Sequence, residues 1–336
     1  MKIIVPMAGR GTRLRPHTLT VPKPLIPIAG KPIVQRLIED LAAVCNTAIN
    51  EVAFVIDRSF GKTVEESLIA IASKLNAKGT ICYQDEKLGT AHAILMAEEA
   101  LKGNVLVAFA DILFKADFNL DLDKDGIIWV QKVEDPSAYG VVKINEKNQI
   151  TDFIEKPETY VSDLAIIGIY YFKDGENLRA ELQYLIENDI RIKGGEFGLT
   201  DALENMKNKG LGLEPGEVAE WLDCGNKESV VNTNQRYLTY LEGQKLVADS
   251  AQIKNSVIIE PVFIGENVIL NNSVVGPYVS IGNNTEIHDS VVSNSIIQEK
   301  SKIKHSNIKN SMIGNQVNYL SKAEILSLGD FNSIEK

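Results

Sequence analysis

Two glycines and an arginine stand close together near the amino terminus, in a pattern that suits phosphate binding. Gly9 and Gly11 follow the apolar run 2–7 and precede Arg13. A backbone without Cβ atoms can approach a phosphate closely and point its N–H groups at it. Arg13 can add a bidentate, charge-assisted hydrogen bond to the same group. The loop is therefore predicted to bind a phosphorylated ligand.

Two common phosphate-binding loops do not fit this segment. The dinucleotide fingerprint of Rossmann dehydrogenases needs a third glycine three residues after the second, where this chain has Leu14. The P-loop pattern GxxxxGK[ST] is absent from the chain. A dehydrogenase is therefore discounted.

The charge distribution points to a small anionic ligand. The chain has 35 Lys+Arg and 45 Asp+Glu among 336 residues, a net charge of −10, yet residues 1–38 contain no Asp or Glu. An acidic chain is a poor binder of nucleic acid, which requires a basic surface. The cations of this first segment are Lys2, Arg10, Arg13, Arg15, Lys23, Lys31 and Arg36.

The loop belongs to a longer series of motifs. Gly11-Thr12-Arg13-Leu14-Arg15-Pro16 is followed by Pro22-Lys23-Pro24, then by Gln84 and Leu88-Gly89-Thr90-Ala91. Asp111, Gly140, Glu155-Lys156-Pro157, Gly168 and Trp221-Leu222-Asp223 come later, in that order. Over residues 1–241 the series resembles the sugar-1-phosphate nucleotidyltransferases. This resemblance implies attack of a sugar 1-phosphate on the α-phosphorus of a nucleoside triphosphate, with release of pyrophosphate.

The resemblance also implies a role for each motif. Arg13, Lys23 and Lys156 would be the catalytic cations, because two polyanions must meet in this reaction. Asp111 and Asp223 would hold Mg²⁺, which takes few carboxylates and keeps phosphate oxygens and water as its other ligands. The nucleotide-binding residues would be Ala8, Gly9, Gly11, Thr12, Gln84, Gly89 and Thr90, and the sugar-binding residues would be Gly140, Glu155 and Gly168.

Two departures from the family pattern leave the base and the sugar open. The loop Ala8-Gly9-Arg10-Gly11 is one residue shorter than the paired-glycine form, and Ile112 stands where the family has asparagine after the aspartate. We expect dTTP or UTP with glucose 1-phosphate. His17 and His92 are interpreted as structural residues.

The pattern of apolar runs predicts how these residues are positioned. Strands are expected at 2–7, 51–56, 80–84 and 105–110, alternating with helices at 33–41, 64–75 and 89–97. Further strands are expected at 127–133, 140–145, 150–155 and 165–172, and helices at 178–188, 199–209 and 226–241. Alternating strands and helices predict a doubly wound, mostly parallel mixed sheet, which the resemblance makes Rossmann-like and GT-A-like.

The pattern of residue types in the sequence changes after about residue 247. Aliphatic residues recur every five or six positions, separated by Gly, Asn and Ser, a period typical of a parallel β-helix. The expected ladder is Ile253, Ile258, Ile264, Val268, Val274, Ile281, Ile287, Ile296, Ile303, Ile308 and Ile313. The predicted organisation is a catalytic domain at 1–243, a short left-handed β-helix at 247–318 and a tail at 319–336.

The sequence leaves two alternatives to a nucleotidyltransferase open. The β-helix could carry acyltransferase activity with His288 or His305 as base, or the chain could be a non-catalytic sensor of nucleotide sugars.

No apolar run in the sequence approaches the ~20 residues that a membrane-spanning helix needs. Cys45, Cys82 and Cys224 form no even framework, which favours reduced thiols in the cytoplasm. We also expect a homo-oligomer.

Overall fold

The computed structural model describes residues 1–116, 120–192 and 194–322. The chain divides into two compact units. The first comprises Met1–Ile26 and Lys31–Ser229, and the second comprises Pro27–Gly30 and the described residues from Val230 onward. Within the described residues, no helix is long and apolar enough to cross a membrane. The three cysteines are free thiols.

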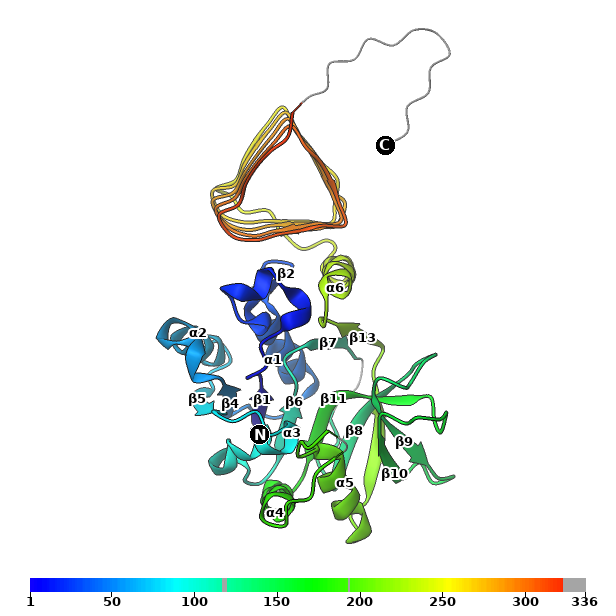
Figure 1. The fold of residues 1–336 in the computed structure, drawn as a ribbon. Helices are drawn as coiled ribbons and strands as arrows, with labels where there is room; N and C mark the ends of the chain where they lie inside the picture. The colour runs from blue at the N-terminus through cyan, green and yellow to red at the C-terminus, as the bar shows by residue number, and fades with distance from the viewer. Residues whose placement is uncertain (117–119, 193, 323–336) are drawn as a thin grey trace. The chain divides into compact units, whose positions relative to one another are not determined.

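The first unit is built on a mixed sheet, as predicted (Figure 1). Its parallel half consists of β1 (Lys2–Pro6), β4 (Glu51–Ile56), β5 (Lys78–Tyr83) and β6 (Val105–Ala108). Its other half consists of β8 (Gly126–Lys132), β9 (Gly140–Ile144), β10 (Ile150–Glu155), β11 (Leu164–Phe172) and β12 (Leu213–Glu217). Strand β11 joins the halves, because it pairs antiparallel with both β6 and β8.

Helices bury both faces of the parallel half. Ile4, Ala53 and Val55 belong to a core that α3 (Thr90–Leu95), α4 (Gly175–Glu187) and α5 (Leu199–Asn208) complete. The alternate residues Ile3 and Phe54 are equally buried on the opposite face. The remaining helices of this unit are α1 (Ile33–Val44) and α2 (Lys62–Ser73), and α2 packs on β4 and β5. Burial on both faces explains why β1, β4 and β6 are nearly continuous apolar runs in the sequence.

A two-stranded ribbon next to the sheet was not predicted. Strand β6 ends at Ala108 rather than at residue 110, and the chain turns at Asp111 into β7 (Ile112–Lys115). Strand β7 pairs antiparallel with β13 (Glu220–Asp223). Both strands are short, and their pairing depends on contacts distant in sequence. Strand β12 was also missed, because Pro215 and Gly216 weaken its strand signal.

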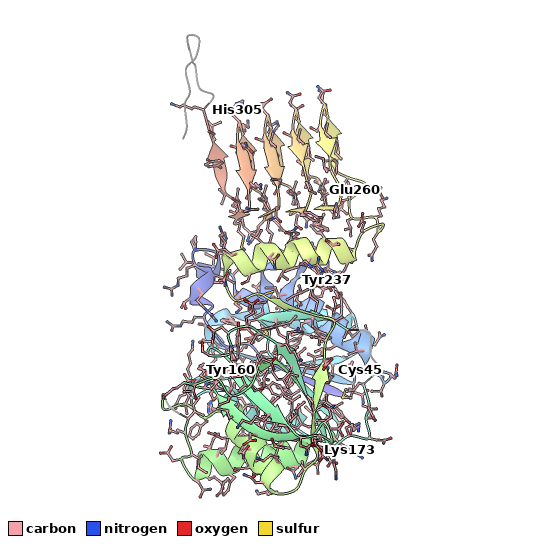
Figure 2. All side chains as sticks on the ribbon, turned by 90° about the vertical axis from the view of Figure 1, so that its right-hand side faces the viewer. Cys45, Tyr160, Lys173, Tyr237, Glu260 and His305 are labelled. Carbon is pink, nitrogen blue, oxygen red and sulfur yellow. The ribbon has the colours of Figure 1, made fainter. Side chains whose placement is uncertain are left out.

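The second unit contains the predicted left-handed parallel β-helix. Its strands form three parallel sheets, β14-β17-β20-β23-β26, β15-β18-β21-β24 and β16-β19-β22-β25. Figure 1 shows the triangular coil end on, and Figure 2 shows it from the side with His305 labelled. The strands are β14 (Gln252–Lys254), β15 (Val257–Ile258), β16 (Val262–Ile264), β17 (Ile269–Asn271), β18 (Val274–Val275), β19 (Val279–Ile281), β20 (Glu286–His288), β21 (Val291–Ser293), β22 (Ser295–Ile297), β23 (Lys302–Lys304), β24 (Asn307–Lys309), β25 (Met312–Ile313) and β26 (Asn318–Leu320).

The ladder inside the β-helix differs in part from the expected one. Val275 and Val292 form the buried column where Val274 was expected, and Ile253 is 42% exposed in the first coil. The reason is the length of a coil. Equivalent corner residues are 17 apart in the early coils and 16 apart in the later ones, so a strict hexapeptide count drifts out of phase.

Helix α6 (Lys227–Tyr240) runs beside the coils, and its residues from Val230 on belong to the second unit (Figure 2). Asn234 on this helix is 0% exposed. Its Oδ1 accepts hydrogen bonds from Ala29 N at 3.0 Å and Ser280 Oγ at 2.7 Å. Its Nδ2 donates to Tyr278 O at 3.4 Å. One buried amide therefore links three segments of the second unit.

Candidate active site

A cavity of about 370 Å³ opens where β1, β5 and β6 end in the first unit. Open α/β sheets bind ligands at the carboxyl ends of their strands. The cavity brings together most of the predicted site residues, namely Ala8, Gly9, Gly11, Thr12, Arg13, Lys23, Gln84, Gly89, Thr90 and Asp111.

The glycine loop forms one wall of this cavity. Gly11 has φ +58°, and a Cβ there would lie 2.8 Å from Cβ of Lys23, so a side chain at this position would be strained and crowded. Thr18 Oγ1 donates to Gly11 O at 2.7 Å. The turn Thr12–Leu14 follows, with Leu14 buried and Arg13 exposed. Leu14 anchors the turn, and Arg13 faces the cavity.

Lys23 and Asp111 form an ion pair in the cavity wall. Lys23 Nζ lies 3.1 Å from Asp111 Oδ2, and the side chains are 10% and 44% exposed, respectively. The lysine lies in the short turn Lys23–Leu25, and the aspartate lies in the turn between β6 and β7. An ammonium group and a carboxylate are thus available to a phosphorylated ligand side by side.

The ribbon of β7 and β13 brings Asp223 close to Asp111 along the backbone. Cys224 N donates to Asp111 O at 2.9 Å. Asp223 Oδ1 accepts from Gly225 N at 3.0 Å, and Gly225 lines the cavity although Asp223 does not. No cluster of three or more His, Cys, Asp or Glu side chains that could hold a metal occurs among the described residues. Two carboxylates fit Mg²⁺, which usually completes its shell with phosphate oxygens and water.

Another part of the cavity lining is formed by Gln84, Gly89 and Thr90. Gly89 has φ +111°, and a Cβ there would clash with the backbone of Phe197. Phe197 N donates to Leu88 O at 2.7 Å, and Leu199 N donates to Thr90 Oγ1 at 3.0 Å. The segment before α5 therefore holds this loop in place.

The expected sugar residues lie next to the cavity lining rather than in it. Gly140 and Glu155 are partners across β9 and β10. Gly168 O accepts from the N–H of Phe109, a lining residue, at 3.0 Å. Lys156 N donates to Tyr139 O at 3.0 Å. The Lys156 side chain is 63% exposed, with Nζ 3.6 Å from Glu155 Oε1.

A ring contact connects this second group to the aspartates. The rings of Tyr139 and Trp221 meet edge to face at 5.3 Å between centroids. Trp221 is two residues before Asp223 on β13. Lys156, Gly140 and Glu155 are therefore grouped around Tyr139, beside the strand that carries Asp223.

Two charged lining residues were not predicted. Lys87 lies between Gln84 and Leu88, and its Nζ is 3.5 Å from Asp57 Oδ2. Its position between Gln84 and Leu88-Gly89-Thr90-Ala91 in the sequence could have identified it as a site residue. Glu196 comes from the segment before α5 and lies near Gly89, and nothing in its local sequence places it in the cavity lining.

Comparisons with known proteins cover the same part of the chain. Residues 2–240 match the family model described as nucleotidyl transferase. The chain is 31% identical over 268 residues to the "Bifunctional protein GlmU" of Methanococcus maripaludis, covering 77% of this chain and 60% of that protein. It is 29% identical over 290 residues to a glucose-1-phosphate thymidylyltransferase of Streptomyces antibioticus, covering 79% of this chain and 78% of the relative.

A solved structure shares the fold. A UDP-glucose pyrophosphorylase complexed with UDP-glucose superposes with a TM-score of 0.58 and 25% identity, over 71% of this chain and 98% of that one. The chain spans 60% of the length of the GlmU relative named above. The family model therefore matches the residues of the mixed sheet, and the strands of the β-helix follow after the matched residues.

Proposed function

Because the chain belongs to the nucleotidyl transferase family, we propose that it condenses a nucleoside triphosphate with a hexose 1-phosphate, giving a nucleoside diphosphate sugar and pyrophosphate. The favoured substrates are dTTP or UTP and glucose 1-phosphate. Residues 1–243 would be the catalytic domain, and residues 247–318 the β-helix domain.

The observation that carries this proposal is the ion pair of Lys23 and Asp111 beside the glycine loop. Transfer of a nucleotidyl group needs positioning and neutralised charge, and no protein nucleophile. The loop at Gly9 and Gly11 would bind the triphosphate through backbone N–H groups. Arg13 would hold the β- and γ-phosphates, which leave as pyrophosphate. Lys23 would stabilise the negative charge that develops on the α-phosphate.

Asp111 and Asp223 would hold Mg²⁺ with the phosphates as its further ligands. The ion, when bound, would neutralise part of the charge on the phosphate oxygens. Lys23 would then exchange its contact with Asp111 for the α-phosphate. Its burial favours this role, because a desolvated ammonium interacts more strongly with a phosphate than an exposed one.

The group around Tyr139 would bind the second substrate. Lys156 would contact the phosphate of the sugar 1-phosphate, and its exposure leaves Nζ free to reach a ligand from the weak pairing with Glu155. Glu155, Gly140 and Gly168 would contact the sugar ring. The two substrates would approach from two sides of Asp111 and Asp223.

A pyrophosphate-release panel tests the proposal. The full chain is incubated with Mg²⁺ and each of dTTP, UTP, GTP, CTP and ATP, in combination with several sugar 1-phosphates. We expect release that depends on both substrates and stops with EDTA. Release without the sugar phosphate, or none with any pair, would overturn the proposal. Acetyl-coenzyme A turnover, measured in parallel, tests the acyltransferase alternative.

A further inference from the structure

The side-chain amide of Gln84 is held in one orientation. Its Nε2 lies 3.2 Å from Gly89 O and 3.2 Å from His92 Nδ1. A carbonyl oxygen can only accept a hydrogen bond, so the amide must present its NH₂ group to Gly89. The NH₂ group therefore points at the protein, and the amide oxygen points away from Gly89.

The amide oxygen is the part of Gln84 left for a ligand. Gln84 lines the cavity and is 6% exposed. Its Oε1 makes no hydrogen bond to any residue in the described part of the chain, whereas its Nε2 is engaged twice. A ligand at this end of the cavity would therefore meet a hydrogen-bond acceptor.

The hydrogen bond from Gln84 Nε2 also determines the tautomer of His92. Because the Gln84 NH₂ donates, Nδ1 must accept and carries no proton, so the neutral ring holds its proton on Nε2. Burial lowers the pKa of His92, which favours this neutral form. The sequence alone suggested only a structural histidine on α3.

We infer that His92 is a positioning residue for base selection, which together with Gly89 O keeps Gln84 Oε1 towards the base. The inference rests on the proposed function and concerns its nucleotide. An acceptor at this point selects a base with a ring N–H, such as uracil, thymine or guanine. It disfavours a base whose equivalent ring nitrogen is itself an acceptor, such as cytosine or adenine.

The geometry also limits how large the effect of His92 can be. A flipped amide would bring Oε1 against Gly89 O and would require His92 to move its proton from Nε2 to Nδ1. Without His92 the repulsion at Gly89 O remains, so the preference should weaken rather than disappear. The loss of one net hydrogen bond corresponds to a change of about fivefold to tenfold in relative affinity.

Two substitutions at His92 separate the acceptor from the bulk of the ring. His92→Leu removes the acceptor, whereas His92→Asn can place an amide oxygen near the position of Nδ1. UTP and CTP form a matched pair, as do dTTP and 5-methyl-dCTP. Calorimetric affinities and kcat/KM are measured for each pair with the wild-type chain and both variants. His305→Leu on the β-helix is the control for loss of a histidine.

We expect the wild-type chain to prefer the base with the ring N–H. His92→Leu should reduce that preference about fivefold to tenfold, and His92→Asn should keep it within about twofold. In a Gln84→Ala background, His92→Leu should cause no further change in the ratio, because the two residues act together. Nitrogen NMR of the wild-type chain should show Nδ1 of His92 unprotonated at neutral pH.

Each outcome decides one question. A wild-type ratio in His92→Leu, or a protonated Nδ1 in the NMR spectrum, would overturn the role of His92. The NMR result applies even if His92→Leu does not fold. Failure of the wild-type chain to release pyrophosphate with any pair would instead overturn the proposed function, while nucleotide affinities and NMR would still test His92.

Discussion

Lys23 Nζ lies 3.1 Å from Asp111 Oδ2, across 88 residues of sequence. The two partners differ in burial, because the lysine side chain is 10% exposed and the aspartate side chain is 44% exposed. Removing one partner therefore has a different effect from removing the other. Loss of the carboxylate leaves a buried ammonium without a counter-charge, whereas loss of the ammonium leaves a carboxylate that water still reaches.

Asp111→Asn should lower turnover by at least about 100-fold, the size typical of losing one charged group from a transition-state site. Pyrophosphate release measures the rate, and circular dichroism shows whether the variant is folded. Asp249→Asn is the control, because Asp249 forms only an exposed pair with Lys245 on the second unit. Near-normal rates in Asp111→Asn would show that the site has been assigned wrongly.

Lys23→Met should also lose about 100-fold in kcat/KM but should unfold at a higher temperature than Asp111→Asn. Methionine fills the buried volume of the lysine chain, and the remaining carboxylate is solvated. The double variant should lose less activity than the two single losses multiplied, because the residues form one pair. Thermal melts and initial rates of all three variants provide the measurement. Equal melting temperatures for the two single variants would contradict the argument.

Stability should fall as the pH drops below 6.5. Burial, with a further contribution from Lys227, lowers the pKa of His17 below its usual 6.5, and burial lowers that of His92. The unfolded chain therefore binds more protons than the folded chain just below pH 6.5, so acid favours unfolding. Urea midpoints at pH 7.5 and at about pH 5.5 measure the loss. In the double variant His17→Asn, His92→Asn the difference between the two midpoints should shrink, and an unchanged difference would exclude these histidines as its source.

Strands β1, β4 and β6 of the parallel half could be predicted because they are buried on both faces. Runs such as Val105–Ala108 are apolar throughout, so their signal is local. Strand β13 could not be found in this way. Its residues Glu220–Asp223 are stabilised as a strand by pairing with β7, which is distant in sequence. The turn at Asp111 depends on the same pairing, and it explains why the predicted strand ran two residues too far.

The register of the β-helix could not be predicted from the spacing of its aliphatic residues alone. Corner residues with positive φ, such as Asn255 and Asn272, recur 17 apart. Asn adopts this conformation more readily than most residues. Counting from these corners would have placed Val275 rather than Val274 inside. In the site, motif residues at strand ends were predictable, whereas the contact of His92 with Gln84 depends on how α3 packs.

Asn234→Ala should destabilise the second unit by about 1–3 kcal/mol, because it removes the buried side-chain hydrogen bonds to Ala29 N, Ser280 Oγ and Tyr278 O. The free energy of unfolding from urea titration is the measurement. Asn232→Ala is the matched control, since Asn232 is exposed on the same helix. A loss no greater than that of the control would mean that the buried amide does not stabilise the unit.

Gly276→Ala should be more harmful than a positive φ alone explains. Gly276 has φ +116°, and a Cβ there would overlap the carbonyl group of Ile259 in the neighbouring coil. Gly243 has φ +82° with nothing within 4 Å of a Cβ, so Gly243→Ala measures backbone strain without the clash. Strain costs about 1–3 kcal/mol and overpacking adds about 1–3 kcal/mol more.

We therefore expect Gly243→Ala to lose only the strain contribution and Gly276→Ala to lose about twice as much, measured as free energies of unfolding by urea titration. The clash involves backbone atoms on a rigid coil, which cannot move aside as the end of a flexible side chain would. If both variants lost the same free energy, the coils would have to be able to spread at Ile259, and the close stacking of the β-helix would not limit the residue at position 276.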